Sequence, residues 1–165
     1  MASTAPTSYS IPQKAIHWLM ALLIFFNLIL SDNIEAWDHA KDEGTVTPEI
    51  LAGANIHAYV GIAVLALGLL RLILRFTQGA PAAPANEPPL FQLAAKLGHA
   101  AFYVIFFAMP ITGMMKYYSD IDLADFLHAE PIKIVLWLVI VGHIAAIPVH
   151  HFVWKTDVAT RMTKG

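Results

Sequence analysis

The stretch PIKIVLWLVIVGHIAAIPVHHFVW, from Pro131 to Trp154, is apolar over a length that can cross a lipid bilayer. A spanning helix needs about 20 largely apolar residues. The same stretch contains three histidines, His143, His150 and His151. Ionisable residues inside a membrane span are rare and usually functional. The stretch therefore predicts a transmembrane helix whose histidines have a chemical role.

The composition of the whole chain is that of a membrane protein. Of its 165 residues, 58% are hydrophobic and 13% are charged, whereas soluble domains have about 25% charged residues. This excludes a typical soluble enzyme, and the lack of cysteine excludes disulfides, iron–sulfur clusters and thiolate zinc sites. We predict an all-α membrane protein, a four-transmembrane-helix bundle that forms one domain over residues 1–165, with helices at Ile11–Leu30, Ile50–Phe76, Leu90–Met115 and Pro131–Trp154.

The distribution of basic residues predicts the orientation of this bundle. Seven of the ten lysines and arginines lie on the side of the two termini, and three lie on the other side. The positive-inside rule then places both termini in the cytoplasm, as a multi-pass protein of a bacterial inner membrane. The N-terminal MASTAPTSYS lacks the basic region of a signal peptide, so we expect the first helix to be retained.

The eight histidines sort into two depths in this topology. His57 and His128 lie near the outer surface, and His39 lies in an acidic outer loop, from Ser31 to Glu49. The other histidines lie toward the cytoplasmic side: His17, His99, His143, His150 and His151.

Helical geometry places three of the histidines of the last helix on one face. At 100° per residue, His143 and His150 are about 20° apart, and His128 is about 60° from His143 if the helix extends that far. His151 is turned away by about 80°. The rise between His128 and His143 is about 22 Å, which suits two objects stacked across the bilayer.

A haem with two histidine ligands, one from each of two helices, fits this pattern. Gly61, one turn after His57, gives a macrocycle room, and Arg71 and Arg75 could meet haem propionates. A zinc or copper site remains an alternative, although zinc sites gather three or four ligands at one point. His99 remains open between a ligand, a propionate contact and an interface residue.

Five segments together resemble the bacterial cytochrome b561 family, which is similar to the di-haem membrane subunits of nickel–iron hydrogenases and formate dehydrogenase. They are AIHWLM, HAYVG, RLILR, LGHAAFYVIFFAMPITGMM and VGHIAAIPVHHFVWKTDVATRM, and they extend over residues 11–162. The resemblance implies two b haems in a four-helix bundle, with axial iron ligands His17 and His143 at the inner haem and His57 and His128 at the outer haem.

The same resemblance assigns no ligand to His99 and shows one departure. The two ligands of the last helix are usually 14 residues apart in such proteins, whereas His128 and His143 are 15 apart. We expect a one-residue adjustment at Pro131 to absorb the difference.

Iron with two axial histidines has no open site, so the expected chemistry is single-electron transfer between the outer side and a quinone, such as ubiquinone, near the inner haem. Quinone reduction consumes protons, and His150 is the candidate proton donor at the quinone site. The resemblance also suggests superoxide oxidation as the specific reaction.

The outer side, with three basic and ten acidic residues, has a formal charge near −7. This charge should slow the approach of superoxide unless Lys116 and Lys133 form a local basic funnel, and it would suit a cationic soluble redox partner. Two alternatives remain: a histidine-lined proton or metal transporter, and a passive haem anchor for a dehydrogenase.

Overall fold

The computed structural model describes residues 6–164. Residues 1–5 and 165, which belong to the predicted domain, lie outside the described residues, and so does the first half of the N-terminal segment MASTAPTSYS. Four helical segments are long and apolar enough to cross a membrane. They are α1 (Ile11–Ile29), α3 (Pro48–Gln78), α4 (Pro89–Ser119) and a last span, Asp122–Val153, made of α5 (Asp122–Leu127), η1 (His128–Ile132), α6 (Lys133–Pro148) and η2 (Val149–Val153). The predicted all-α membrane bundle is confirmed.

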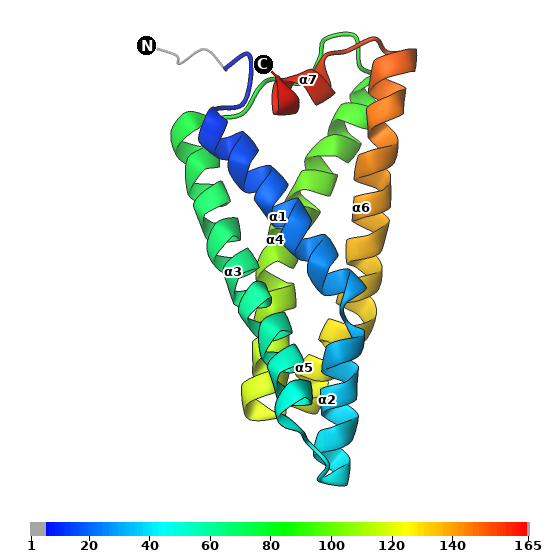
Figure 1. Ribbon diagram of the computed structural model, residues 1–165. Helices are drawn as coiled ribbons and strands as arrows, with labels where there is room; N and C mark the ends of the chain where they lie inside the picture. Colours follow the sequence, from blue (N-terminus) through cyan, green and yellow to red (C-terminus); the bar gives the residue numbers. More distant parts are fainter. Residues whose placement is uncertain (1–5, 165) are drawn as a thin grey trace.

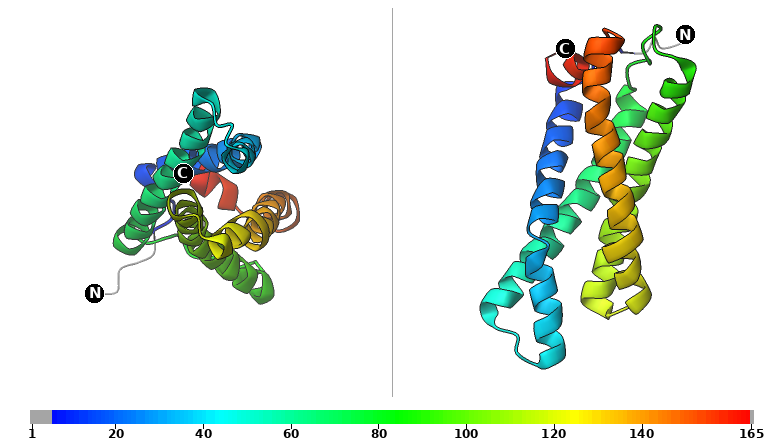
Figure 2. Two further views of the ribbon diagram at one scale, coloured as in Figure 1. Left: turned by 90° about the horizontal axis from the view of Figure 1, so that it is seen from below. Right: turned by 90° about the vertical axis from the view of Figure 1, so that its right-hand side faces the viewer.

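Two short helices mark the two ends of the bundle (Figures 1 and 2). Helix α7 (Val158–Thr163) lies at the upper end as drawn in Figure 1, where α1 begins, and α2 (Asp32–Glu43) lies at the lower end. We call these the upper and lower ends throughout. The acidic segment expected to be a loop is therefore largely helical. Its Trp37 and Ala40 are buried, and Asp32 and Glu35 in the first turn complement the helix dipole.

The last span differs from its predicted bounds because it begins at Asp122 and not at Pro131. It contains two turns of π-helix, η1 and η2. Pro131 lies inside η1, and Pro148 immediately precedes η2. A proline has no N–H to donate and its ring crowds the preceding turn, and a π-helical turn holds one extra residue within a continuous helix. The span therefore continues past both prolines.

The interior of the bundle is small and apolar. One cluster of buried side chains joins Ile16 and Met20 of α1 to Phe106 of α4, and a second joins Ile105 to Leu136 and Ile140. Many large apolar side chains face outward along all four spans. Such an exterior is the surface that a lipid bilayer covers. The pockets at the two histidine-bearing levels adjoin these clusters, and Phe106 lines both of them.

Candidate functional site

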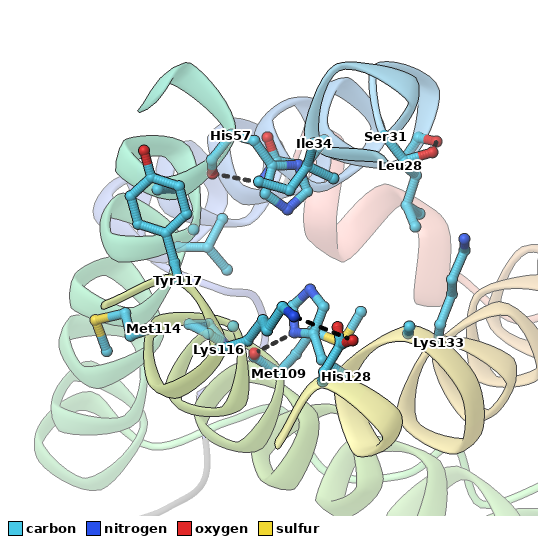
Figure 3. Close-up of a pocket in the computed structure, with 18 of the residues that line it drawn as sticks. Leu28, Ser31, Ile34, His57, Met109, Met114, Lys116, Tyr117, His128 and Lys133 are labelled. Carbon is cyan, nitrogen blue, oxygen red and sulfur yellow. Dashed lines mark hydrogen bonds and ion pairs between the residues drawn. The ribbon is translucent and has the colours of Figure 1, made fainter. Parts of the chain in front are cut away.

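The lower pocket lies between α1, α2, α3, α4 and the start of the last span. His57 of α3 and His128 of η1 face each other across it (Figure 3). Their ring centres are 6.2 Å apart and their planes are inclined by 73°. The structure therefore brings together the two histidines predicted at the outer level.

Neighbouring groups fix the His128 ring in this position. Its Nδ1 lies 2.8 Å from the backbone carbonyl oxygen of Met109, so an Nδ1–H donates there and Nε2 remains free as a ligand atom. Gly113 allows the close approach, because a Cβ at that position would lie 2.8 Å from His128 Cε1. On the opposite wall, Asn27 donates from Nδ2 to the carbonyl oxygen of His57.

The π-helical turn η1 explains how His128 reaches this place. His128 is the first residue of the turn, and Pro131 is its fourth. Because the turn holds one residue more than an α-helical turn, the 15-residue interval to His143 spans the helix as 14 regular residues would. A one-residue adjustment was expected at Pro131, and the turn supplies one there.

The upper pocket contains a second pair of facing histidines and a third ring beside them. The ring centres of His17 and His143 are 6.1 Å apart, and those of His99 and His143 are 6.0 Å apart. His99 Nδ1 lies 2.6 Å from the Ala95 carbonyl oxygen, so its Nε2 is also free. Arg71 and Arg75 line the same pocket. The sequence predicted His17, His99 and His143 at one depth. It did not predict that His99 and His17 lie at nearly the same distance from His143.

Both histidine pairs fit the geometry of iron with two axial imidazoles. A metal–imidazole bond is about 2 Å long and a ring centre lies about 1 Å behind its nitrogen, so two imidazoles on one metal have centres about 6 Å apart. Among residues 6–164, no group of three or more His, Cys, Asp or Glu side chains is placed to hold a bare metal ion. A porphyrin would supply the four remaining ligands of each iron. Gly61 lines the lower pocket, and a Cβ there would meet nothing within 4 Å, which leaves space for a macrocycle.

Comparison with known proteins agrees with this geometry. The sequence profile of the prokaryotic cytochrome b561 family matches residues 8–165. The chain belongs to this family. The cytochrome is 28% identical to a protein named probable superoxide oxidase CybB from Yersinia pestis, over 93% of this chain and 94% of that protein. It is 29% identical to cytochrome b562 from Cereibacter sphaeroides over 98% of both chains, and 25% identical to cytochrome b561 homolog 2 from Escherichia coli over 82% of this chain and 64% of that protein.

Family membership makes the cytochrome a haem-containing membrane protein of electron transport. It also explains why the histidines face each other in pairs: haem is the group that they are expected to bind, which the ring separations alone do not identify. In each pocket the predicted ligand pair joins the last span to one other helix, α3 in the lower pocket and α1 in the upper, and His99 of α4 adds a third ring to the upper pocket.

His150 lies outside the upper pocket, although the helical phase predicted it on the His143 face. It is 8% exposed, and its Nδ1 lies 2.8 Å from Thr156 Oγ1. Its Nε2 lies 3.8 Å from the carboxylate of Glu87, which is 5% exposed. His151 is exposed and contacts the Phe152 ring. Sequence reasoning missed Glu87. The one feature that could have drawn attention to it was its acidic side chain on the side of the bundle that carries most of the basic residues.

Charged residues surround the lower pocket unevenly. Lys116 forms ion pairs with Asp38, Asp120 and Asp125, at 3.2, 3.3 and 3.6 Å. Hydrogen bonds from Lys41 and Lys116 lower the pKa of the Asp120 carboxyl. Lys116 is thus held by carboxylates, which does not fit the expected basic funnel. Lys133 also lines the pocket, and within residues 6–164 it has no ion pair.

Proposed function

We propose that the cytochrome holds one b haem in each pocket and transfers single electrons from the lower side of the membrane to a quinone near the upper side. The observation that supports this most strongly is the pair of equal ring separations, 6.2 Å for His57–His128 and 6.1 Å for His17–His143. Each separation matches the distance of about 6 Å expected between the ring centres of two imidazoles bound to one iron. Iron ligated in this way has no open position for dioxygen, which favours outer-sphere electron transfer.

The pocket residues hold and orient the proposed group in distinct ways. His57 and His128 would ligate one iron, and Met109 holds the His128 ring with Nε2 toward it. His17 and His143 would ligate the other, and Arg71 and Arg75 are placed to receive propionates. When bound, haem supplies a reversible one-electron carrier at each level.

The orientation follows from charge. The upper end carries the start of α1, helix α7 and most of the basic residues, which favours placement of that end in the cytoplasm and of the lower end outside, in a bacterial inner membrane. The quinone would then accept electrons at the upper level, with His150 as the proposed proton donor. Because His150 lies outside the upper pocket, it would donate this proton from its position beside Glu87.

Superoxide is the electron donor that we favour. The similarity to a protein named as a probable superoxide oxidase supports this choice. Two superoxide anions would each give one electron and leave as dioxygen, and the quinone would take two electrons and two protons to form quinol. Lys133 is the basic residue best placed to attract the anion, because carboxylates neutralise Lys116.

The visible spectrum of the purified protein tests the haem proposal. We expect a reduced b-type α-band and two haems per chain. A colourless protein would contradict it and favour a histidine-lined transporter. Stopped-flow mixing with superoxide then tests the donor: we expect haem reduction that is slower in Lys133→Gln, and faster at high salt because salt screens the net negative charge of the lower end. No reduction by superoxide at any salt concentration would eliminate the oxidase.

Exposed carboxylates favour a second candidate donor, a cationic soluble redox protein. Asp32, Glu35, Asp42 and Glu43 of α2 are exposed beside the lower pocket, and such a surface attracts a basic partner. In this case, a basic soluble cytochrome should reduce the protein with a rate that falls as salt is added. Charge-reversing variants of α2 should slow that reaction and speed reduction by superoxide, because they remove negative charge that repels the anion.

A further inference from the structure

The junction between the α3–α4 linker and the end of the last span buries a carboxylate and an imidazole together. Glu87 ends the linker and is 5% exposed, and His150 of η2 is 8% exposed. The Nε2 to Oε1 distance of 3.8 Å is that of an ion pair but is longer than a hydrogen bond. Neither residue lines the haem pockets.

The surroundings of the pair hold its backbone in place but leave its reactive atoms uncommitted. Gln92 donates to the Glu87 backbone carbonyl at 2.8 Å, and Asn86 donates to the carbonyl of Trp154 at 2.8 Å. Within residues 6–164, no hydrogen bond reaches the Glu87 carboxylate oxygens or His150 Nε2. The backbone around the pair is therefore held by hydrogen bonds, while the Glu87 carboxylate oxygens and His150 Nε2 remain available to a ligand.

The burial and separation of the two groups suit proton exchange between them. A buried carboxylate is strongly destabilised unless it is protonated or faces a cation. The imidazole of His150 faces the Glu87 carboxylate, and its other nitrogen contacts the neutral hydroxyl of Thr156. The pair therefore places a carboxyl oxygen and an imidazole nitrogen, two groups that can exchange a proton, side by side in a buried position.

Aromatic rings connect the pair to the lipid-facing surface. The Trp154 ring centre lies 4.9 Å from that of His150, and the Phe91 ring lies 4.9 Å from Trp154 on the other side. Phe91 is 49% exposed on the outer surface of α4. A flat, apolar quinone head entering from the bilayer would find a stacking surface that leads to the free Nε2.

We propose that Glu87 and His150 form a proton-relay pair, in which His150 gives a proton to the bound quinone and Glu87 restores it from water at the upper surface. This deepens the proposed function and rests on it. Each quinone takes two electrons, delivered singly, and two protons. One proton comes from His150 Nε2–H, and the second follows after Glu87 has passed on a proton from water. Glu87 acts through His150 and is a positioning and relay residue.

The test compares two acceptors on Glu87→Gln. The reduced cytochrome is mixed with a short-chain ubiquinone, which needs protons, or with ferricyanide, which needs only electrons. We expect Glu87→Gln to slow re-oxidation by ubiquinone by about 10²-fold, within the range for loss of a proton-transfer group. Re-oxidation by ferricyanide, haem content and the spectrum should stay unchanged. Glu87→Asp should recover much of the rate, and Glu49→Gln, at an exposed position in the first turn of α3, is the matched control.

The outcomes separate the relay from the proposed function. If Glu87→Gln reacts with ubiquinone at the wild-type rate, or if both acceptors slow equally, the relay is wrong and quinone-linked transfer stands. If the wild-type protein reacts with ferricyanide but not with ubiquinone, the quinone proposal fails and the relay fails with it. Should Glu87→Gln not accumulate with haem, Thr156→Val removes the His150 Nδ1 contact, and it should slow the ubiquinone reaction alone. A wild-type rate in that variant would overturn the relay.

Discussion

The upper and lower pockets present the same pair of facing imidazoles in different electrostatic surroundings. The ring separations differ by only 0.1 Å, at 6.1 and 6.2 Å. The lower pocket is lined by carboxylates from α2 and α5 as well as by Lys116 and Lys133. The upper pocket is lined by Arg71, Arg75 and a third histidine, His99.

This difference suggests how one motif can give direction to electron flow. Oxidised haem iron has one more positive charge than the reduced form, so nearby cations favour reduction and nearby carboxylates favour oxidation. Of the two proposed haems, the one in the upper pocket should then have the higher reduction potential. Electrons would move downhill from the lower pocket toward the upper one, where the quinone is proposed to bind.

Removal of one proposed ligand from each pocket should have the largest effect. We expect His57→Ala to abolish the lower haem and His17→Ala the upper haem, so that each variant keeps one haem per chain. Pyridine haemochrome analysis of the purified proteins measures this number. His39→Ala on exposed α2 is the control and should keep two.

His99 sharpens this comparison because only the upper pocket has a competing ring. We expect His99→Ala to retain two haems, as the family resemblance implies. If His99→Ala loses one haem and His17→Ala loses none, His99 and not His17 is the ligand. Loss of both haems in either ligand variant would contradict independent pockets.

Changing the length of the π-helical turn should break only the lower pocket. One alanine inserted after Ala129 rotates His128 by about 100° relative to α6, and we expect loss of the lower haem alone. Deletion of Ala129 should be tolerated, because η1 can become a regular α-helical turn. Haem content and potentiometric titration distinguish these cases. An insertion that keeps both haems would show that η1 does not set the His128 position.

Filling the space beside His128 should weaken the lower site without abolishing it. In Gly113→Ala the added Cβ would lie 2.8 Å from the anchored imidazole, and overpacking of this kind costs about 1–3 kcal/mol. Gly98→Ala on the same helix meets nothing within 4 Å. We expect a lower midpoint for thermal haem loss in the first variant and no change in the second. Equal midpoints would show that the ring can move at little cost.

Removing one cation from the upper pocket tests the electrostatic difference directly. We expect Arg71→Gln to lower the potential of the upper haem, by an amount on the order of tens of mV for one charge at moderate distance. Lys133→Gln should instead lower the potential of the lower haem. Spectroelectrochemical titration resolves the two haems. A rise in the upper potential would refute the proposed role of the arginine.

The smallest effect should come from the ion pairs at the lower end. The pKa of Asp120 is lowered by its hydrogen bonds to Lys41 and Lys116. A lowered carboxyl pKa stabilises the folded state above the unfolded-state pKa, and this contribution is lost as the pH falls through the folded-state pKa. We therefore expect Asp120→Asn to melt slightly below wild type at pH 7. In strong acid the two proteins should have the same melting temperature. A difference in melting temperature that grows as the pH falls would contradict a stabilising role of the ionised Asp120 carboxylate.

The sequence predicted more of the fold than of the site. The apolar segments indicated four membrane helices, and the structure confirms the all-α membrane bundle. The family was predicted from five short segments and is confirmed by the profile match. The ligand pairing, His17 with His143 and His57 with His128, remains a prediction that the observed spacing supports. The position of His150 against Glu87 was not predicted, because helical phase describes one helix and says nothing about the linker packed on it.

Sequence alone thus determined what is local and periodic: the spans, the two depths of the histidines and the excess of basic residues at one end. These follow from hydropathy and from a fixed rise per residue. Only the tertiary structure decided which rings face each other, that η1 turns His128 toward His57, and that carboxylates hold Lys116. The physical reason is that such contacts depend on the relative placement of different helices, which no single helix encodes.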